Sequence, residues 1–345
     1  MNAARDETTQ ATPTAPDRAP FDFAKWWDRV GILMVLMTLV ILMSAIAPNF
    51  NRVDNLLNIA RAISVNAILA AGMTLVILTG GIDLSVGSIV AVSGVVSVIA
   101  AIAGVPAPAA ICIGVAAGAA CGLINGALTA YLSLAPFIVT LGTMTFLRGL
   151  AYTITEGQPI VSSSLNFKAI GNGYLWGVPM PALVMAIVYL IVWFILERTR
   201  YGRHVYAVGG NAEAAKLAGV RVKRVITSVY VLAGGCAGLA GVIFAARVIS
   251  AQPTAGTGYE LDAIAAVVLG GTSLAGGRGR IVGTLIGSVI LGVLGTGLIL
   301  LNVPFFTQLL IKGVVIIVAV AIDSLKQRSG LFRFSKKVPP RGSGR

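Results

Sequence analysis

One acidic residue stands in a glycine-rich connection between two long apolar segments, where its carboxylate could do chemistry. Asp83 lies in GGIDLSVG at 80–87, directly before an apolar run. An aspartate there can cap the following helix, because its carboxylate accepts backbone amide hydrogens and interacts favourably with the helix dipole. The neighbouring glycines allow a sharp turn. We expect the capping role, and a gating role for Asp83 and Ser85 is compatible with it.

Uncharged polar side chains also stand inside the apolar runs. Four of them carry amide or hydroxyl groups that could hydrogen-bond a neutral, hydroxyl-rich solute: Asn66, Asn125, Thr140 and Thr143. We treat them as candidates for lining a solute path. Hydrogen bonding from helix to helix is the alternative for each of them, and it is common in membrane proteins.

No set of residues in the sequence suits catalysis or metal binding. There is no Ser/His/Asp set, no Cys/His cluster and no pair of carboxylates at helical spacing inside an apolar run. No Gly-x4-Gly-Lys-Ser/Thr loop occurs, so if ATP powers this protein, the ATPase must be another chain. We expect neither an enzyme nor a bound cofactor or metal. The ionisable residues in the middle of apolar runs reduce to Arg148 and Lys312, and we expect Lys312 to reach toward an interface.

The elements that must position these residues are membrane helices. The chain has 345 residues, of which 57% are hydrophobic and 11% charged, and its mean hydropathy is +0.89. A soluble protein is about 25% charged. Apolar runs long enough to cross a bilayer predict an all-α, multi-pass membrane protein with about ten spans. They lie at 30–47, 62–80, 84–104, 107–130, 135–154, 180–197, 224–246, 260–275, 281–301 and 305–323.

The distribution of positive charge predicts the orientation. With the N-terminus inside, 20 of the 26 Lys and Arg residues fall on the inner side, and four fall outside. Positive residues concentrate in cytoplasmic segments, so both termini are expected in the cytoplasm. The net charge of +13 thus reflects topology and not nucleic-acid binding. We divide the chain into an N-terminal tail (1–29), a membrane domain (30–323) and a C-terminal tail (324–345).

The inner loop 198–224 contains a candidate docking helix. Its segment GGNAEAAKLAGV at 209–220 begins after two glycines, with Asn211 as a good N-cap and Gly219 as a good stop. Glu213 near the start and Lys216 near the end suit the helix dipole. A short exposed helix is marginal alone, so we expect it to dock on a partner. An amphipathic surface helix without a partner is the alternative.

Small residues and a weak internal echo suggest how the helices pack. Glycines recur every fourth residue at Gly114, Gly118, Gly122 and Gly126, which predicts one closely packed helix face. The segment LTGGIDLSVGS at 78–88 resembles LGGTSLAGGRG at 269–279. The echo hints at an internal repeat, which transporters often have.

Four long motifs resemble the ribose-type permease family of ABC importers. They are GMTLVILTGGIDLSVGSIVAVSG (72–94), PFIVTLGTMTFLRGLAY (136–152), GRHVYAVGGNAEAAKLAGV (202–220) and GYELDAIAAVVLGGTSLAGGRGRIVGTLIG (258–287). The resemblance covers about residues 30–325 and keeps the family's order. It implies an inner-membrane permease that works as a homodimer in lipid, with a cytoplasmic ABC ATPase and a periplasmic sugar-binding protein.

The resemblance also implies roles for particular residues. The segment 211–219 matches the family's loop that contacts the ATPase, so Asn211, Glu213, Ala214 and Gly219 are expected to transmit the ATP-driven movement. Because the outer loops are otherwise poor in charge, and not because a family motif covers them, four outer basic residues are expected to hold acidic groups of the binding protein: Arg52, Arg61, Lys168 and Arg247. The solute implied is a monosaccharide, most simply ribose or a related pentose, carried by alternating access.

Three rival functions stay open at this stage. An ion-coupled secondary carrier would need a buried carboxylate pair, and none is apparent. A branched-chain amino acid permease of the same architecture would need charged partners for its cargo along the path. A membrane enzyme would need a catalytic cluster.

Overall fold

The computed structural model describes residues 23–334, with side chains described for 31–318, 320 and 321. Its long helices are α1 (Phe23–Ile46), α2 (Val53–Leu78), α3 (Val86–Ile102), α4 (Ala107–Tyr131), α5 (Pro136–Ile154), α7 (Met180–Arg198), α10 (Val222–Val248), α12 (Ile281–Leu300) and α13 (Phe305–Phe334). Short helices are α6 (Ala169–Asn172), α8 (Arg200–Gly210), α9 (Ala212–Leu217) and α11 (Tyr259–Leu269). The strands β1 (Ile160–Val161) and β4 (Ser250–Ala251) pair antiparallel, as do β2 (Tyr174–Leu175) and β3 (Val178–Pro179).

Six of the described helices are long and apolar enough to cross a membrane: α2, α4, α5, α7, α10 and α12. The apolar parts of α1, α3 and α13 are shorter. The prediction of one span over 260–275 is wrong in its bounds, because α11 ends at Leu269 and a loop follows. Its 11 residues extend about 16 Å, roughly half of a hydrocarbon core. The multi-pass helical class is confirmed, and the count of ten stays a prediction.

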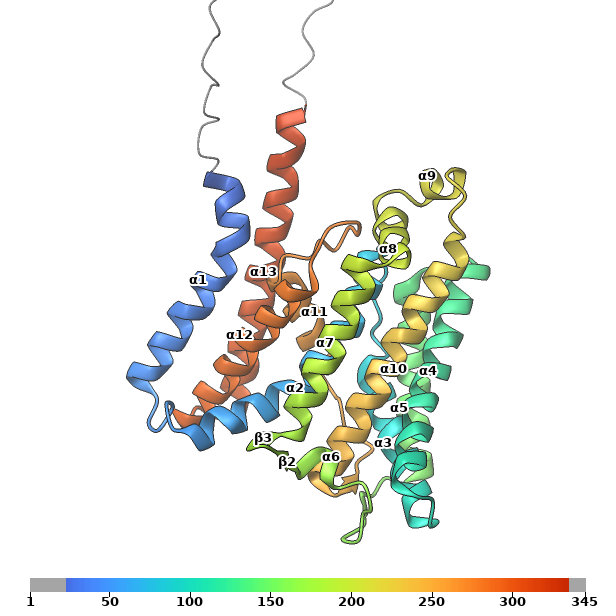
Figure 1. Cartoon of the computed structure of the whole chain (residues 1–345), viewed down its shortest axis with the longest axis vertical. Coiled ribbons are helices and arrows are strands. Elements are labelled where there is room, and N and C mark those ends of the chain that lie inside the picture. Colours follow the sequence, from blue (N-terminus) through green and yellow to red (C-terminus); the bar gives the residue numbers. More distant parts are fainter. Residues whose placement is uncertain (1–22, 335–345) are drawn as a thin grey trace, which may run out of the picture.

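Helices α2 and α10 form the centre of the bundle. Figure 1 shows α1, α12 and α13 on one side, α3, α4 and α5 on the other, and α7 and α10 between them. The second half of α2, from Ala67 to Leu78, is buried throughout. Helix α10 packs against α2, α3 and α4. A hydrophobic helix that is buried all round belongs in the interior of such a bundle.

The glycine ladder of α4 packs directly against α10. A Cβ atom added at Gly118 would lie 2.7 Å from the Cα atom of Gly238, and one added at Gly126 would lie 2.8 Å from the Cα atom of Thr227. Added Cβ atoms at Gly114 and Gly122 would also meet α10. The predicted close helix packing is therefore confirmed, and small residues are what allow the two backbones to approach.

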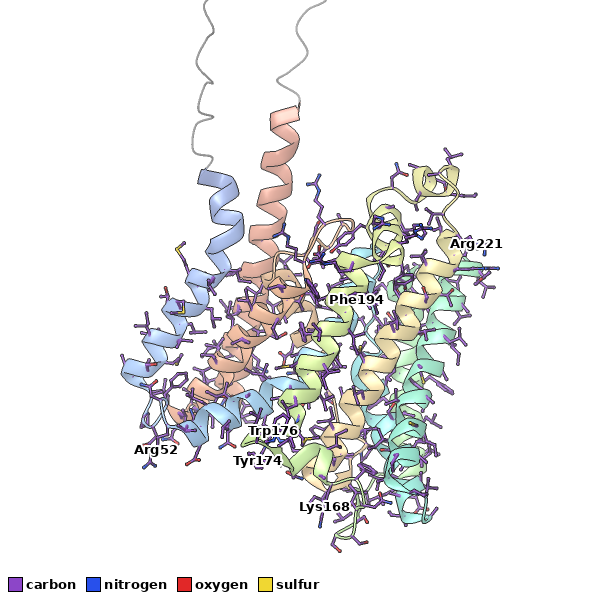
Figure 2. All side chains as sticks on the ribbon, in the orientation of Figure 1. Arg52, Lys168, Tyr174, Trp176, Phe194 and Arg221 are labelled. Carbon is purple, nitrogen blue, oxygen red and sulfur yellow. The ribbon has the colours of Figure 1, made fainter. Side chains whose placement is uncertain are left out.

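The bundle has two distinct ends. The start of α1, the end of α13, and the helices α8 and α9 lie together at one end in Figure 1. The β2–β3 hairpin and α6 lie at the opposite end, with Arg52 and Lys168 (Figure 2). Helix α1 begins at Phe23 and α13 continues to Phe334, so both helices extend into the segments expected as tails. The rest of those tails lies outside the described residues.

Candidate functional site

The connection between α2 and α3 holds a buried carboxylate. Asp83 is fully buried, and its Oδ1 accepts a hydrogen bond from the Ser85 backbone amide at 2.9 Å and from Ser85 Oγ at 2.6 Å. The residue in the N-cap position of α3 is Ser85, not Asp83. Asp83 thus accepts a backbone amide hydrogen as expected, but it does so in the turn that leads into α3 and not at the N-cap position.

A chain of hydrogen bonds runs from this turn to α4 and on to α5. Asn125 Nδ2 on α4 donates to Ser85 Oγ at 2.8 Å, and Thr143 Oγ1 on α5 donates to Asn125 Oδ1 at 2.6 Å. Thr140 Oγ1 contacts the Ile82 carbonyl at 3.2 Å. The structure thus brings the two expected gate residues together with three of the four expected path residues. We call this set the gate network: Asp83, Ser85, Asn125, Thr140 and Thr143.

The gate network has one open position. Asp83 Oδ2 is buried and has no hydrogen-bond partner among the described residues. Burial raises the pKa of Asp83, and the hydrogen bonds from Ser85 act in the opposite direction. The rise follows because removing a carboxylate from water disfavours its charged form.

The fourth expected path residue, Asn66, lies apart from this network and beside α11. Its Nδ2 donates to Asp262 Oδ2 at 3.3 Å, and Lys312 Nζ forms an ion pair with the same oxygen at 2.9 Å. The expectation that Lys312 reaches toward an interface is wrong, because it turns to a carboxylate on the neighbouring helix. Sequence reasoning missed Asp262.

A second missed carboxylate, Glu260, stands on the same turn of α11. It lies close enough to Arg148 for the two charges to interact. Arg148 Nη1 also donates to the carbonyls of Pro253 and Ala255, each at 2.7 Å. The signal for both acids was present in the motif at 258–287, at the start of an expected span. Asp262 forms an ion pair with Lys312, and Glu260 lies within electrostatic reach of Arg148.

The short helix expected within 209–220 is present as α9, which spans Ala212–Leu217. Gly209 and Gly210 end α8, and Asn211 caps α9 by accepting from the Ala214 amide at 2.9 Å. Gly219 follows α9 with a φ of +84°, a left-handed conformation that favours glycine. The cap and the stop are therefore confirmed.

Helix α9 stands out from the bundle at its tip. Most of its residues are exposed, and Leu217 is 89% exposed. Figure 1 shows α9 beyond α8 and the start of α10, at the same end as the last turns of α13. An exposed leucine at such a tip is available to a partner protein.

Helix α8 connects this tip to both loops of the internal echo. The Gly277 amide donates to the Leu78 carbonyl at 2.9 Å, so the loops after α2 and α11 touch. Gly209 of α8 lies against the same two groups. Tyr206 OH donates to the Gly279 carbonyl at 3.0 Å. Burial and Glu197 raise the pKa of Tyr206 to about 12, so this phenol stays protonated as a donor.

The four outer basic residues fall into two pairs. Arg52 and Lys168 are exposed at the end opposite α9 (Figure 2), whereas Arg61 and Arg247 are half-buried. The Arg61 guanidinium lies 4.9 Å from the centre of the Tyr174 ring. Beside it, Trp176 at the tip of the β2–β3 hairpin is 92% exposed. Sequence reasoning missed this aromatic hairpin, which no charge pattern could have indicated.

A family model and curated relatives match almost the whole chain. The family described as branched-chain amino acid transport system / permease component matches residues 55–320. The ribose import permease of Escherichia coli strain K12 is 49% identical over 320 residues, which is 92% of this chain and 99% of the relative. The ribose import permease of Bacillus subtilis is 48% identical over the same shares.

A transporter for another sugar is similar at lower identity. The D-allose transport system permease of Escherichia coli is 41% identical over 92% of this chain and 98% of the relative. No solved structure matches the chain.

Proposed function

This chain belongs to the family of permease components described for branched-chain amino acid transport systems, and we propose that it imports ribose or a related monosaccharide. The observation that carries the proposal is the 49% identity to a ribose import permease along 99% of that relative. It is a multi-pass membrane permease and carries no ATPase site of its own. The importer would be driven by a separate cytoplasmic ABC ATPase and supplied by a periplasmic sugar-binding protein.

The chemistry of the described interior supports a neutral solute. The gate network consists largely of hydroxyl and amide groups, and the acids on α11 each lie beside a base. An ion-coupled carrier is less favoured, because the relatives that match nearly the whole chain are import permeases for ribose and allose. The permease then works by switching between two conformations, one of which ATP binding favours.

Four sets of residues carry the proposed roles. The gate network would close the cytoplasmic side, and its members Asn125, Thr140 and Thr143 would border the solute path together with Asn66. Helix α9, with Asn211, Glu213, Ala214 and Gly219, would dock on the ATPase. The exposed pair Arg52 and Lys168, supported by Arg61 and Arg247, would meet the binding protein. We also propose about ten spans, a homodimer in lipid, and an inner-membrane location.

Reconstitution tests the proposed function directly. The purified chain, its ATPase and its binding protein are assembled in proteoliposomes, and uptake of labelled ribose, allose and arabinose is measured with and without ATP. ATP-dependent accumulation of at least one of these sugars is expected. Uptake that depends on an imposed ion gradient and is unchanged by ATP would contradict the proposal.

A further inference from the structure

Three helices each direct one polar side chain to the same point. Asn66 of α2 and Lys312 of α13 both donate to Asp262 Oδ2 of α11, at 3.3 and 2.9 Å. We call these residues the α11 triad. Asn66 Oδ1 is buried and has no hydrogen-bond partner among the described residues. One acceptor in the triad therefore remains open.

The α11 triad lies at membrane depth. Asn66 stands near the middle of α2, whose 26 residues are long enough to span the bilayer. Lys312 lies within the apolar stretch Phe305–Val318, about 10 Å along the axis from the start of α13. A hydrocarbon core is about 30 Å thick, so neither residue lies at a membrane surface.

Protein does not seal the triad from its surroundings. The Lys312 side chain is 32% exposed and that of Asp262 is 13% exposed, and the adjacent Leu261 and Leu309 are exposed as well. Charged side chains at membrane depth face the bundle interior or a water-filled cavity, because hydrocarbon leaves them unsolvated. This face of α11 and α13 is therefore expected to turn toward the partner subunit or a water-filled path, and not toward lipid.

We infer that the α11 triad is a contact site for the sugar as it crosses the membrane, an inference that rests on the proposed function. Asp262 accepts hydrogen bonds from hydroxyl groups, Lys312 donates them, and the Asn66 amide oxygen offers a further acceptor. The opposite charges of Asp262 and Lys312 cancel, which suits an uncharged polyol. The site is the outer counterpart of the gate network, which lies at the end of the bundle near α8.

Cysteine accessibility tests whether this face meets water. In a background without Cys112, Cys121 and Cys236, cysteine replaces Leu261 or Leu309, and a charged, membrane-impermeant thiol reagent is added to proteoliposomes. Ile191→Cys on the exposed face of α7 is the matched control. Reaction at positions 261 and 309 is expected to be at least tenfold faster than at 191. Equal rates at the three positions would overturn the inference.

A charge exchange separates sugar contact from a structural ion pair. Asp262→Asn keeps the size and an acceptor oxygen, so the fold is expected to persist while ATP-dependent uptake falls at least tenfold. The double variant Asp262→Lys with Lys312→Asp restores the pair in reverse. If the pair were only structural, the exchange would recover uptake, and that recovery would overturn the inference. Normal uptake by Asp262→Asn would overturn it as well.

The proposed function and the assignment of the triad would fail in different ways. If the unmodified complex transports none of the tested sugars, the proposed function fails, and the cysteine rates still report whether the face meets water. If the unmodified complex transports a sugar and the triad variants transport it equally well, only the assignment of the triad fails.

Discussion

Asp83 places its two carboxylate oxygens in different surroundings, and this asymmetry predicts the effect of replacing it. Oδ1 holds the turn through Ser85, whereas Oδ2 is buried without a partner. An asparagine oxygen can keep the first interaction at no cost in buried charge. We therefore expect Asp83→Asn to insert and transport nearly as well as the natural chain. Asp83→Ala leaves the Ser85 donors unpaired and is expected to lose about 1–3 kcal/mol of stability.

The dependence of stability on pH checks the same residue independently. Because burial raises the pKa of Asp83 above its ordinary value of 3.8, the folded chain binds this proton more tightly than the unfolded chain. The free energy of unfolding therefore falls as pH rises from 3.8 through the raised pKa. Asp83→Asn has no carboxyl group at this position, so its free energy of unfolding should not fall in this way. Thermal unfolding in detergent across that range should show the variant gaining relative to the natural chain, and parallel curves would contradict the prediction.

At the scale of residues, local chemistry could be predicted and distant pairing could not. The position of Asn211 before an alanine-rich segment predicts a cap, and the cap forms with the Ala214 amide only three residues away. Asp262 was missed because its partner Lys312 is 50 residues away on another helix. The same separation explains why the sequence alone predicts that Lys312 reaches an interface. Sequence spacing says nothing about which helices become neighbours.

Among the elements, α9 is the clearest candidate for contact with the ATPase. Its exposed face includes Ala214 and Leu217, so Ala214→Trp or Leu217→Asp should weaken docking without disturbing the membrane helices. Gly219 is less informative, because its φ of +84° makes any larger residue strained whatever the partner. We expect uptake to fall about tenfold or more, since overpacking an interface costs about 1–3 kcal/mol.

The measurement for α9 is ATPase stimulation by the loaded binding protein, together with uptake. Tryptophan introduced at Ser343 in the tail is the control and is expected to be silent. Normal stimulation in both α9 variants would show that α9 does not transmit the movement.

The end of α8 offers a matched pair of neighbouring glycines. A Cβ atom at Gly209 would collide with the Leu78 carbonyl and would lie 2.6 Å from the Gly277 amide nitrogen, whereas one at Gly210 meets nothing within 4 Å. Both are backbone groups that cannot rotate away. Gly209→Ala is therefore expected to cost about 1–3 kcal/mol and to uncouple ATP hydrolysis from uptake.

Gly210→Ala is the control for Gly209→Ala. It should leave uptake unchanged and leave stability equal or up to about 1 kcal/mol higher, because alanine favours the helix. Thermal unfolding and coupled uptake of the two variants give the comparison. Equal stability and equal uptake of the two variants would mean that α8 does not pack closely against the two loops.

The two similar segments, 78–88 and 269–279, could be found in the sequence, but the contact between their loops could not. The similarity of 78–88 to 269–279 was visible, and it hinted at a repeat. The meeting of the two loops through Gly277 and Leu78, under the end of α8, was not predictable, because it depends on how the whole bundle closes. Hydropathy likewise could not show that α11 stops at Leu269, since the loop after it is also rich in small residues.

Over the whole molecule, the outer end is expected to recognise a binding protein weakly and electrostatically. Arg52→Glu together with Lys168→Glu reverses the two exposed charges, and each exposed pair contributes about 0.2–1 kcal/mol. The affinity of the loaded binding protein should fall about twofold to thirtyfold at low salt and little at high salt. Surface plasmon resonance at two ionic strengths measures this, and an unchanged affinity at low salt would contradict it.

The overall topology is the broadest property that remains to be tested. The first turn of α1, the last turn of α13 and the basic helix α8 lie at one end of the bundle (Figure 1), and the positive residues of the sequence concentrate on the same side. Because short basic segments stay in the cytoplasm, both termini should be cytoplasmic. A fluorescent protein fused after Arg345 should therefore mature and fluoresce, whereas alkaline phosphatase fused there should be inactive. The same phosphatase inserted at Gly177, in the hairpin at the opposite end, should be active. The reverse pattern would require an odd change in the number of spans, and it would also move α9 away from any cytoplasmic ATPase.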